Sequence, residues 1–171
     1  MSNPPRSRHP QRIEPGPGQE SVWDYPRPPR LEPSEEHVVV RHGGAVVADT
    51  THSYRVLETS QPPTYYFPPD DVDLQLLVPS TRRSMCEWKG LASYFDVVVG
   101  PEVRPAAAWT YPDPTPAFEE IRGYLAFYPQ LLEECLVDGE RASPNEGGFY
   151  GGWVTSRIVG PFKGGPGTAG W

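Results

Sequence analysis

The chain has 171 residues, including 23 prolines and 17 glycines, and a formal net charge of −7. Proline and glycine together are about twice as frequent as in an average globular protein, yet the 37 % of apolar residues are enough for a buried core. The acidic charge and the scattered basic residues argue against binding to nucleic acid, and no apolar run approaches the roughly 18 residues of a membrane span. We therefore expect neither a nucleic-acid nor a membrane partner.

The cysteines and the N-terminal residues indicate a compartment. Cys86 and Cys135 are the only cysteines, too few for a disulfide framework. The first 20 residues lack the apolar core of a secretory signal. These features predict a protein of the reducing cytoplasm.

The composition changes near residue 20. Residues 1–20 contain five prolines and, after Met1, a single large apolar side chain, Ile13, so they bury too little surface to offset the entropy lost on ordering. The sequence predicts a disordered Pro-rich tail over 1–20, one domain over 21–165 and a flexible C-terminus over 166–171. At the start of the domain, the prolines of residues 26–33 are expected to keep an extended segment out of regular strand pairing.

Short strands separated by turn signals follow in chain order. Gly43-Gly44 and Asp138-Gly139 are typical of two-residue hairpin turns. Short apolar and β-branched segments predict strands over residues 37–42, 45–49, 53–59, 64–67, 74–78, 93–99, 106–111 and 134–137. This many short strands with regular breaks predicts a mainly β fold, either a sandwich or a barrel-like sheet.

One α-helix is predicted near residues 116–128. Thr115 is suited to cap it, with Pro116 in the first helical position and Pro129 at its end. Gly123 weakens the helix slightly. Four apolar residues then fall on one helical face: Phe118, Ile121, Leu125 and Tyr128.

Several longer motifs resemble a known family. They are VWDYPRPP (22–29), RVLETSQPPTYYFPPDDV (55–72), CEWKGLASYF (86–95), WTYPDP (109–114), GYLAFYP (123–129) and GGFYGGWVTSRIVGPFKG (147–164). In order and spacing they closely resemble domain-of-unknown-function family 427 over about residues 21–165. The resemblance implies a β-tent-like fold, in which two small antiparallel sheets meet at an angle, as in methionine sulfoxide reductase B and the thalidomide-binding domain of cereblon.

The resemblance also raises the question of a metal. The β-tent relatives hold a structural zinc with two Cys-x-x-Cys pairs, whereas Cys86 and Cys135 stand alone. His37 and His42 would lie on opposite faces of one strand. We therefore expect no structural zinc and no dedicated metal site, and we leave the cofactor unknown.

The family carries a nucleotidyltransferase label. Asp71 and Asp73, before an apolar run, superficially resemble the paired carboxylates of a two-metal site. A resemblance to the nucleotidyltransferase superfamily would imply a Gly-Ser motif at the start of a helix, upstream of these aspartates. Here the upstream residues 59–63 contain no glycine and two prolines. The label is unsupported by this sequence, and we interpret Asp70, Asp71 and Asp73 as a solvated turn.

The turn around Lys89 is the first candidate site. Lys89 follows Trp88 and precedes Gly90, and Cys86 is expected on the same face. A lysine desolvated beside aromatic rings can have a lowered pKa and act as a base or nucleophile, and its ammonium can favour a thiolate. In the structural alternative, Trp88 anchors the turn, Cys86 fills the core and the Lys89 stem covers the ring.

A second candidate combines Arg55 and Glu58 with Tyr65 and Tyr66. A carboxylate at a strand end near an arginine can orient a polar ligand or serve as a general base. The alternative is that these charged residues form an ordinary cross-strand ion pair.

The third candidate is an aromatic and glycine-rich stretch. Paired glycines allow a backbone to approach a ligand closely, and flanking rings supply flat walls. We expect these residues either to line a cage for a planar or cationic ligand or to fill the core of a small domain: Phe149, Tyr150, Gly151, Gly152 and Trp153, with Trp88, Tyr94, Trp109 and Tyr111.

Three functions remain open. The first is an enzyme acting on a small molecule through Lys89, Cys86 and Glu58; the second is a binding or sensing module with the same pocket and no turnover. The third is a protein-interaction domain that docks through its Pro-rich tail. Small-molecule handling is favoured, with an enzyme slightly ahead of a binding module, and the sequence does not predict the oligomeric state.

Overall fold

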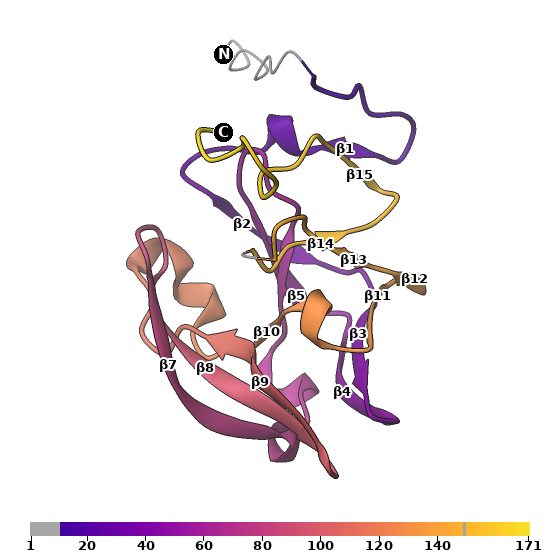
Figure 1. Cartoon of the computed structure of the whole chain (residues 1–171). Coiled ribbons are helices and arrows are strands. Elements are labelled where there is room, and N and C mark those ends of the chain that lie inside the picture. The colour runs from indigo at the N-terminus through magenta and orange to yellow at the C-terminus, as the bar shows by residue number, and fades with distance from the viewer. Residues whose placement is uncertain (1–10, 149) are drawn as a thin grey trace.

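The computed structural model describes residues 11–148 and 150–171. Two predictions concern residues outside this part of the chain. They are the disorder of residues 1–10 and the role of Phe149 in an aromatic cage. Within it the fold is mainly β, as the sequence predicts (Figure 1). No helix of the described residues has the length and apolar character needed to cross a membrane.

The regular elements are short and numerous. The strands are β1 (Glu20–Ser21), β2 (Arg30–Ser34), β3 (Val38–His42), β4 (Ala45–Thr50), β5 (Ser53–Leu57), β6 (Thr64–Tyr66), β7 (Leu77–Cys86), β8 (Gly90–Val99), β9 (Glu102–Thr110), β10 (Ala126–Phe127), β11 (Glu134–Val137), β12 (Glu140–Arg141), β13 (Ser143–Pro144), β14 (Trp153–Val154) and β15 (Ile158–Val159). The 3-10 helices are η1 (Val22–Asp24), η2 (Pro69–Asp71), η3 (Leu74–Leu76), η4 (Pro116–Ile121) and η5 (Pro129–Leu131).

These strands build more sheets than the two that the family resemblance implies. One antiparallel sheet has the order β10-β9-β8-β7, a second has the order β12-β11-β3-β4, and a third has the order β2-β5-β6. Two short pairs, β13-β14 and the parallel β1-β15, complete the described part. Figure 1 shows β7, β8 and β9 as a long curved ribbon on one side of the molecule, with β3 and β4 on the other.

Both predicted hairpin turns are confirmed. Gly43 and Gly44 join β3 to β4 with φ values of 58° and 80°, and Asp138 and Gly139 join β11 to β12 with φ values of 47° and 83°. Two consecutive positive φ angles match the twist of the flanking strands, which explains why these residue pairs are found there.

The predicted α-helix near residues 116–128 is wrong in type and length. A helix begins at Pro116, but it is a 3-10 helix that ends at Ile121. Gly123 follows with φ of 75°, and Ala126–Phe127 form β10. Thr115 does not cap the helix, because its hydroxyl donates instead to the carbonyl of Trp88 at 2.6 Å. The four residues of the predicted helix face are all buried nonetheless. The apolar pattern therefore predicted their burial correctly but not their secondary structure.

Two strands run through prolines that were expected to exclude them. Pro33 lies within β2 and pairs in register with Tyr54 of β5. Pro79 lies within β7, which begins at Leu77 and continues to Cys86, whereas residues 74–76 form η3. Both strands are at the edge of their sheets, where a missing N–H on the open side costs no ladder hydrogen bond.

Both chain ends contact the domain over the residues that the structure describes. Of the predicted disordered tail, residues 11–20 contact the domain: the Ile13 amide donates to the carbonyl of Gly160, and Glu20 pairs with Ile158 in β1-β15. At the other end, Trp171 packs edge-to-face on Trp23 with ring centroids 5.6 Å apart. Both ends therefore cover one small core, whose buried residues are Val22, Trp23, Tyr25, Leu57 and Ile158.

Two larger cores lie on the long sheet. The first combines it with β3, β4 and β11, and its largest fully buried side chain is Trp153, whose Nε1 donates to the Phe127 carbonyl at 3.1 Å. The second combines it with β5, β6 and η4, and it includes Tyr66, Tyr94 and Trp109. The sheet of β7, β8, β9 and β10 thus contributes side chains both to the interior of the domain and to an aromatic face.

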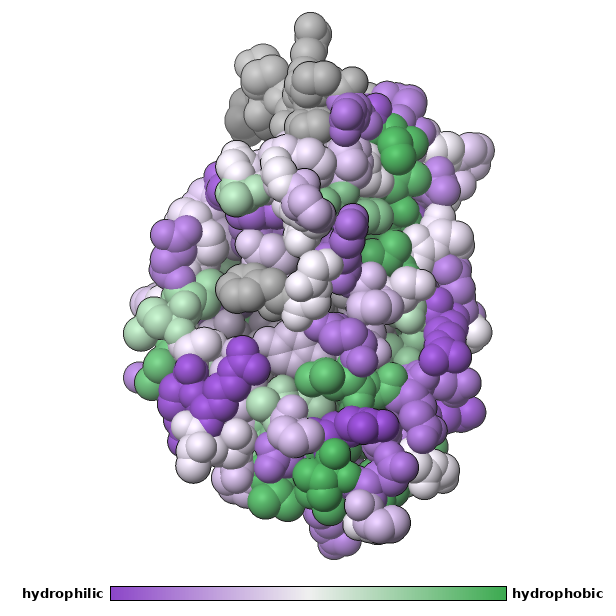
Figure 2. Space-filling model, in the orientation of Figure 1, coloured by the Kyte–Doolittle hydropathy of each residue, from purple (hydrophilic) through white to green (hydrophobic). Residues whose placement is uncertain are grey.

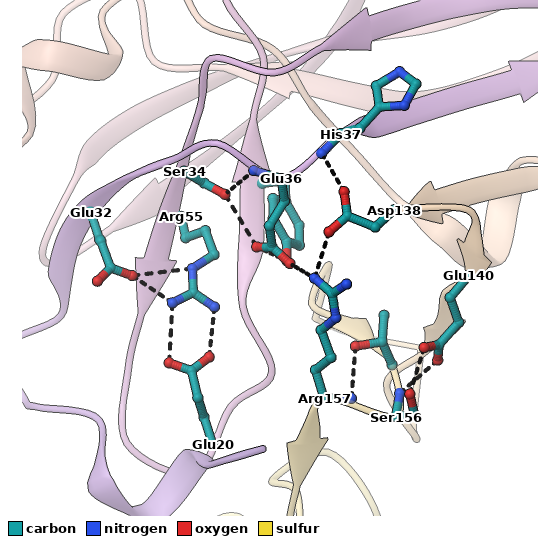
Figure 3. A network of polar contacts seen from close by, with 12 residues as sticks. Glu20, Glu32, Ser34, Glu36, His37, Arg55, Asp138, Glu140, Ser156 and Arg157 are labelled. Atoms are coloured by element: carbon teal, nitrogen blue, oxygen red, sulfur yellow. Dashed lines mark hydrogen bonds and ion pairs between the residues drawn. The ribbon is translucent and has the colours of Figure 1, made fainter. Parts of the chain in front are cut away.

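Arginine–carboxylate contacts join the chain ends to the sheets. Figure 3 shows Arg55 between Glu32 and Glu20, with its guanidinium nitrogens 2.5 Å and 2.7 Å from the respective carboxylates. Arg157 similarly lies between Asp138 and Glu36, at 2.7 Å and 2.9 Å. Charge-assisted hydrogen bonds of this length are among the stronger polar contacts in proteins.

These contacts lower the pKa of several carboxyl groups. Hydrogen bonding to Arg55 lowers the pKa of Glu20, and the backbone N–H of His37 lowers that of Asp138. Hydrogen bonds from Ser156 lower the pKa of Glu140. A carboxyl group with a lowered folded-state pKa stabilises the fold above its ordinary pKa, and this stabilisation is lost as the pH falls through the folded value.

We predict that acid destabilises the domain, beginning near the ordinary glutamate pKa of 4.5. The urea midpoint should fall as the pH is lowered from 7 to 3, because each of these carboxylates must take up a proton. Glu20→Gln should make the urea midpoint less dependent on pH. It should also lower the free energy of unfolding at neutral pH by roughly 1 kcal/mol, a small value because the Glu20 carboxylate is half-exposed. Glu120→Gln, at an exposed position of η4, is the control. An unchanged pH dependence in Glu20→Gln would contradict the assignment.

Candidate functional site

A cavity of about 300 Å3 opens beside the second core, and we call it the tyrosine pocket. Its walls come from β7, β8 and β9, from the segment between β5 and β6, and from residues 150–151. The lining residues are Glu58, Gln61, Thr64, Tyr66, Arg82, Ser84, Met85, Cys86, Lys89, Tyr94, Trp109, Tyr111, Tyr128, Tyr150 and Gly151. They include eight of the fourteen site residues predicted from the sequence.

Strand alternation brings the side chains from the long sheet together. Alternate residues of a strand share one face, so Ser84 and Cys86 of β7 and Tyr94 of β8 can project to the same side. Tyr94 is the direct cross-strand partner of Trp109, and their ring centroids lie 6.5 Å apart. The aromatic wall therefore follows from the register of β8 and β9.

Packed rings make this wall rigid. Trp109 contacts Tyr128 with centroids 4.5 Å apart and meets Tyr66 edge-to-face at 6.3 Å. The Trp109 Nε1 donates to the Tyr66 hydroxyl at 3.3 Å. Burial raises the pKa of Tyr66, Tyr111 and Tyr128. Their phenols therefore stay protonated at neutral pH and can donate as well as accept hydrogen bonds.

The turn between β7 and β8 carries Lys89 and is fixed from outside. Thr115 donates hydrogen bonds to two successive carbonyls. Its hydroxyl donates to the Trp88 carbonyl at 2.6 Å, and its amide donates to the Lys89 carbonyl at 3.1 Å. Gly90 has φ of 106°, a conformation that side chains rarely adopt. Trp88 and Gly90 do not line the pocket. They shape the turn, as the structural alternative for Trp88 proposed.

The environment of Lys89 differs from the one expected. Burial disfavours its ammonium, but Tyr66, Cys86 and Glu58 favour it more strongly, so the pKa of Lys89 is raised and not lowered. The Nζ atom lies 5.8 Å from the ring centroid of Tyr111 and 5.9 Å from that of Phe118. A raised pKa does not favour the neutral base or nucleophile expected of Lys89, whose ammonium lines the pocket.

Arg55 forms an ordinary cross-strand ion pair with Glu32, its partner in register on β2, and does not join Glu58 in one site. Arg55 binds Glu20 and Glu32 and lies outside the tyrosine pocket. Glu58 lines the pocket, but its carboxylate is 3.4 Å from Arg27 and accepts a hydrogen bond from Gln61 at 3.1 Å. Arg55 is thus an ordinary ion-pair residue, with partners that the sequence analysis did not identify.

Three further predicted site residues belong to the interior. Tyr65 packs on Trp153 with ring centroids 5.1 Å apart, and its hydroxyl donates to Glu36 at 2.9 Å. Trp153 is fully buried. A Cβ atom added to Gly152 would lie 2.8 Å from the carbonyl oxygen of Pro62. Trp153 and Gly152 therefore follow the core alternative and not the cage, and Tyr65 of the second candidate also belongs to the core.

Gly151 has a different role from the one proposed for it. It lines the pocket, but a Cβ added there would collide with the ring of Trp109. The glycine admits a protein ring, not a ligand, to close approach. Lys163, in the same C-terminal segment, lies 5.8 Å from the ring centroid of Tyr150.

The sequence analysis missed several pocket residues. Arg82 and Ser84 precede Cys86 at spacings of four and two, which is the pattern of one strand face. This signal was overlooked because β7 was expected to end before Pro79. Tyr128, expected on a helix face, also reaches the pocket. Ser84 contacts the Tyr94 hydroxyl at 2.7 Å, and the Arg82 guanidinium lies 4.5 Å from the Tyr94 ring centroid.

A separate cluster has the donors of a metal site. His42, Glu102 and Glu133 each place a possible ligand atom within 4.8 Å of the others. The His42 Nδ1 accepts a hydrogen bond from the Glu133 amide at 3.2 Å, and its Nε2 lies 3.1 Å from the Glu102 carboxylate. Nδ1 then carries the lone pair, so Nε2 carries the proton and donates to Glu102. Both ring nitrogens are thereby satisfied without a metal.

We predict that Trp153 contributes stability and not ligand contacts. Trp153→Phe should lower the free energy of unfolding by about 2 kcal/mol, because it opens space in the core and removes the donor to the Phe127 carbonyl. Trp88→Phe, at a half-buried position, should cost less. Urea unfolding of both variants tests this expectation, and equal stability of Trp153→Phe and the unchanged protein would refute it.

Comparisons with known proteins identify the family. A search of curated proteins gave no match. The family model NTP_transf_9, described as domain of unknown function DUF427, matches residues 30–138, more than half of the chain. The motifs at 22–29 and 147–164, and the pocket residues Tyr150 and Gly151, lie outside the matched range. The chain belongs to the DUF427 family, as the sequence motifs predict.

Proposed function

We propose that this domain binds a small planar molecule in the tyrosine pocket. The observation that carries the proposal is the convergence of ring faces and polar groups on one cavity: Trp109 and Tyr94 supply flat walls, and Ser84, Tyr66 and Lys89 supply hydrogen-bonding atoms. Ligand pockets combine mainly apolar or aromatic walls with a few well-placed polar groups. The volume of about 300 Å3 suits a ligand of one or two rings.

A second candidate, chemistry on the bound molecule, is favoured by the position of Cys86. The thiol and the Lys89 ammonium line the same cavity and interact with each other. A fixed ammonium stabilises negative charge that develops on a neighbouring sulfur or substrate oxygen. In this scheme Cys86 is the nucleophile and Lys89 the electrostatic partner. Glu58 is a weaker candidate for the base, because its carboxylate is engaged by Arg27 and Gln61.

Filling the pocket should abolish binding. Native mass spectrometry of the purified chain, followed by thermal-shift screening of one- and two-ring compounds, would identify ligands. Ser84→Leu places a larger side chain in the pocket, so it should weaken binding at least tenfold. Ser80→Leu, on the same strand but outside the pocket, is the matched control. Equal affinity of the two variants would refute the location of the site.

Alkylation should distinguish the two cysteines. Both are free thiols, and the reducing compartment expected from the sequence stays a prediction. Cys135 is buried, and desolvation raises its pKa to about 12, so it should react very slowly with iodoacetamide in the folded chain. Cys86 is half-buried beside Lys89 and should react at least tenfold faster.

Mass spectrometry after timed alkylation measures both rates. Lys89→Met should slow the reaction of Cys86 and leave that of Cys135 unchanged. If Lys89→Met left the Cys86 rate intact, the pairing proposed for catalysis would be wrong, although the binding proposal would stand.

A further inference from the structure

We infer that the ligand of the tyrosine pocket carries a negatively charged oxygen group, a carboxylate or a phosphate, and that Lys89 and Arg82 recognise it. This inference rests on the proposed function, because it names the chemical class of the molecule bound there. It concerns the charge of the ligand, which neither the family description nor the aromatic walls specify.

The charge balance of the pocket is opposite to that of the chain. The protein has a net charge of −7, yet its pocket is lined by two cations, Lys89 and Arg82, and one carboxylate, Glu58. Glu58 is already engaged by Arg27 and Gln61. The net charge that the lining residues offer to a ligand is therefore positive.

The two cations also lack partners of the usual kind. Several arginines outside the pocket, such as Arg55, Arg122 and Arg157, have carboxylates within 4.0 Å. Over residues 11–148 and 150–171, neither Lys89 nor Arg82 has one within that distance. The half-buried Lys89 ammonium is partly removed from water without a counter-ion, which is unfavourable, and an anionic ligand would relieve this cost.

The same contacts argue against a cationic ligand. Aromatic cages hold cations over ring faces, but Arg82 lies over Tyr94 at 4.5 Å and Lys89 lies 5.8 Å from the centroid of Tyr111. Protein cations therefore already occupy this position, and a second positive charge would be repelled. Of the planar and cationic ligands considered from the sequence, only a planar ligand fits.

The neutral hydroxyl groups complete the arrangement. Tyr66 and Tyr111 are protonated at neutral pH, as the ordinary phenol pKa of 10.0 requires, and burial raises the pKa of both further. A protonated phenol can donate a hydrogen bond to an anionic oxygen, whereas a phenolate would repel it. The pocket thus combines ring walls, hydroxyl donors and two cations, which together suit an aromatic acid.

Titration of the full chain with matched probes tests the inference. The probes are indole-3-carboxylate and phenyl phosphate as anions, indole-3-carboxamide as the neutral analogue and tryptamine as the cation. Isothermal titration calorimetry at two salt concentrations should show at least tenfold tighter binding of one or both anions than of the amide, decreasing at higher salt. The two anions separate carboxylate from phosphate recognition.

Variants then assign the recognition to the two cations. Lys89→Met and Arg82→Gln should each remove most of the preference for the anion, whereas Arg83→Gln, adjacent on β7 and outside the pocket, should keep it. Circular dichroism reports whether Lys89→Met folds. If Lys89→Met does not fold, the inference is tested by Arg82→Gln, at an exposed position, and by the salt dependence of binding to the unchanged protein.

Each result has a defined meaning. Equal binding of carboxylate and carboxamide, or tighter binding of tryptamine, would overturn the inference and leave the proposed small-molecule site intact. A preference for the anion that survives in both Lys89→Met and Arg82→Gln would also overturn it. Failure of all four probes to bind would count against both the inference and the proposed function.

Discussion

The packing of Trp109 is the interaction on which both the second core and the pocket depend. Its ring contacts Tyr94, Tyr66 and Tyr128, and Gly151 leaves room for it from the C-terminal segment. The ring is thus held by β8, by the residue that follows β10, by β6 and by a segment distant in sequence. A wall built in this way needs no rearrangement to receive a flat molecule, because its rings are already packed against one another.

The sequence was most informative where a local backbone rule applied. The hairpins at Gly43-Gly44 and Asp138-Gly139 follow from two consecutive positive φ angles, and the strand over 134–137 has the predicted bounds. It was least informative where tertiary contacts decided the outcome. Burial of Phe118 and Ile121 was predicted with the wrong helix, because apolar spacing cannot separate an α-helix from a 3-10 turn followed by a strand.

The candidate site shows the same division. The turn around Lys89 and the rings Tyr94, Trp109 and Tyr111 were identified from residue type and do meet in one cavity. Arg55 could not be assigned, because its partners Glu20 and Glu32 come from the predicted tail and from a proline-containing strand that was expected to stay unpaired. The direction of the Lys89 pKa shift could not be predicted either, because it depends on Tyr66 and Glu58, which approach Lys89 only in the folded chain.

Thr115 holds the turn of Lys89 only through main-chain carbonyls. Those two hydrogen bonds make no demand on the side chain at position 89, since any residue presents the same carbonyl. The backbone of the turn and the chemistry that it displays are therefore separable. An exchange of the charged side chain can alter what the pocket accepts while the loop keeps its course, which makes this turn a natural point for functional divergence and for redesign of the domain.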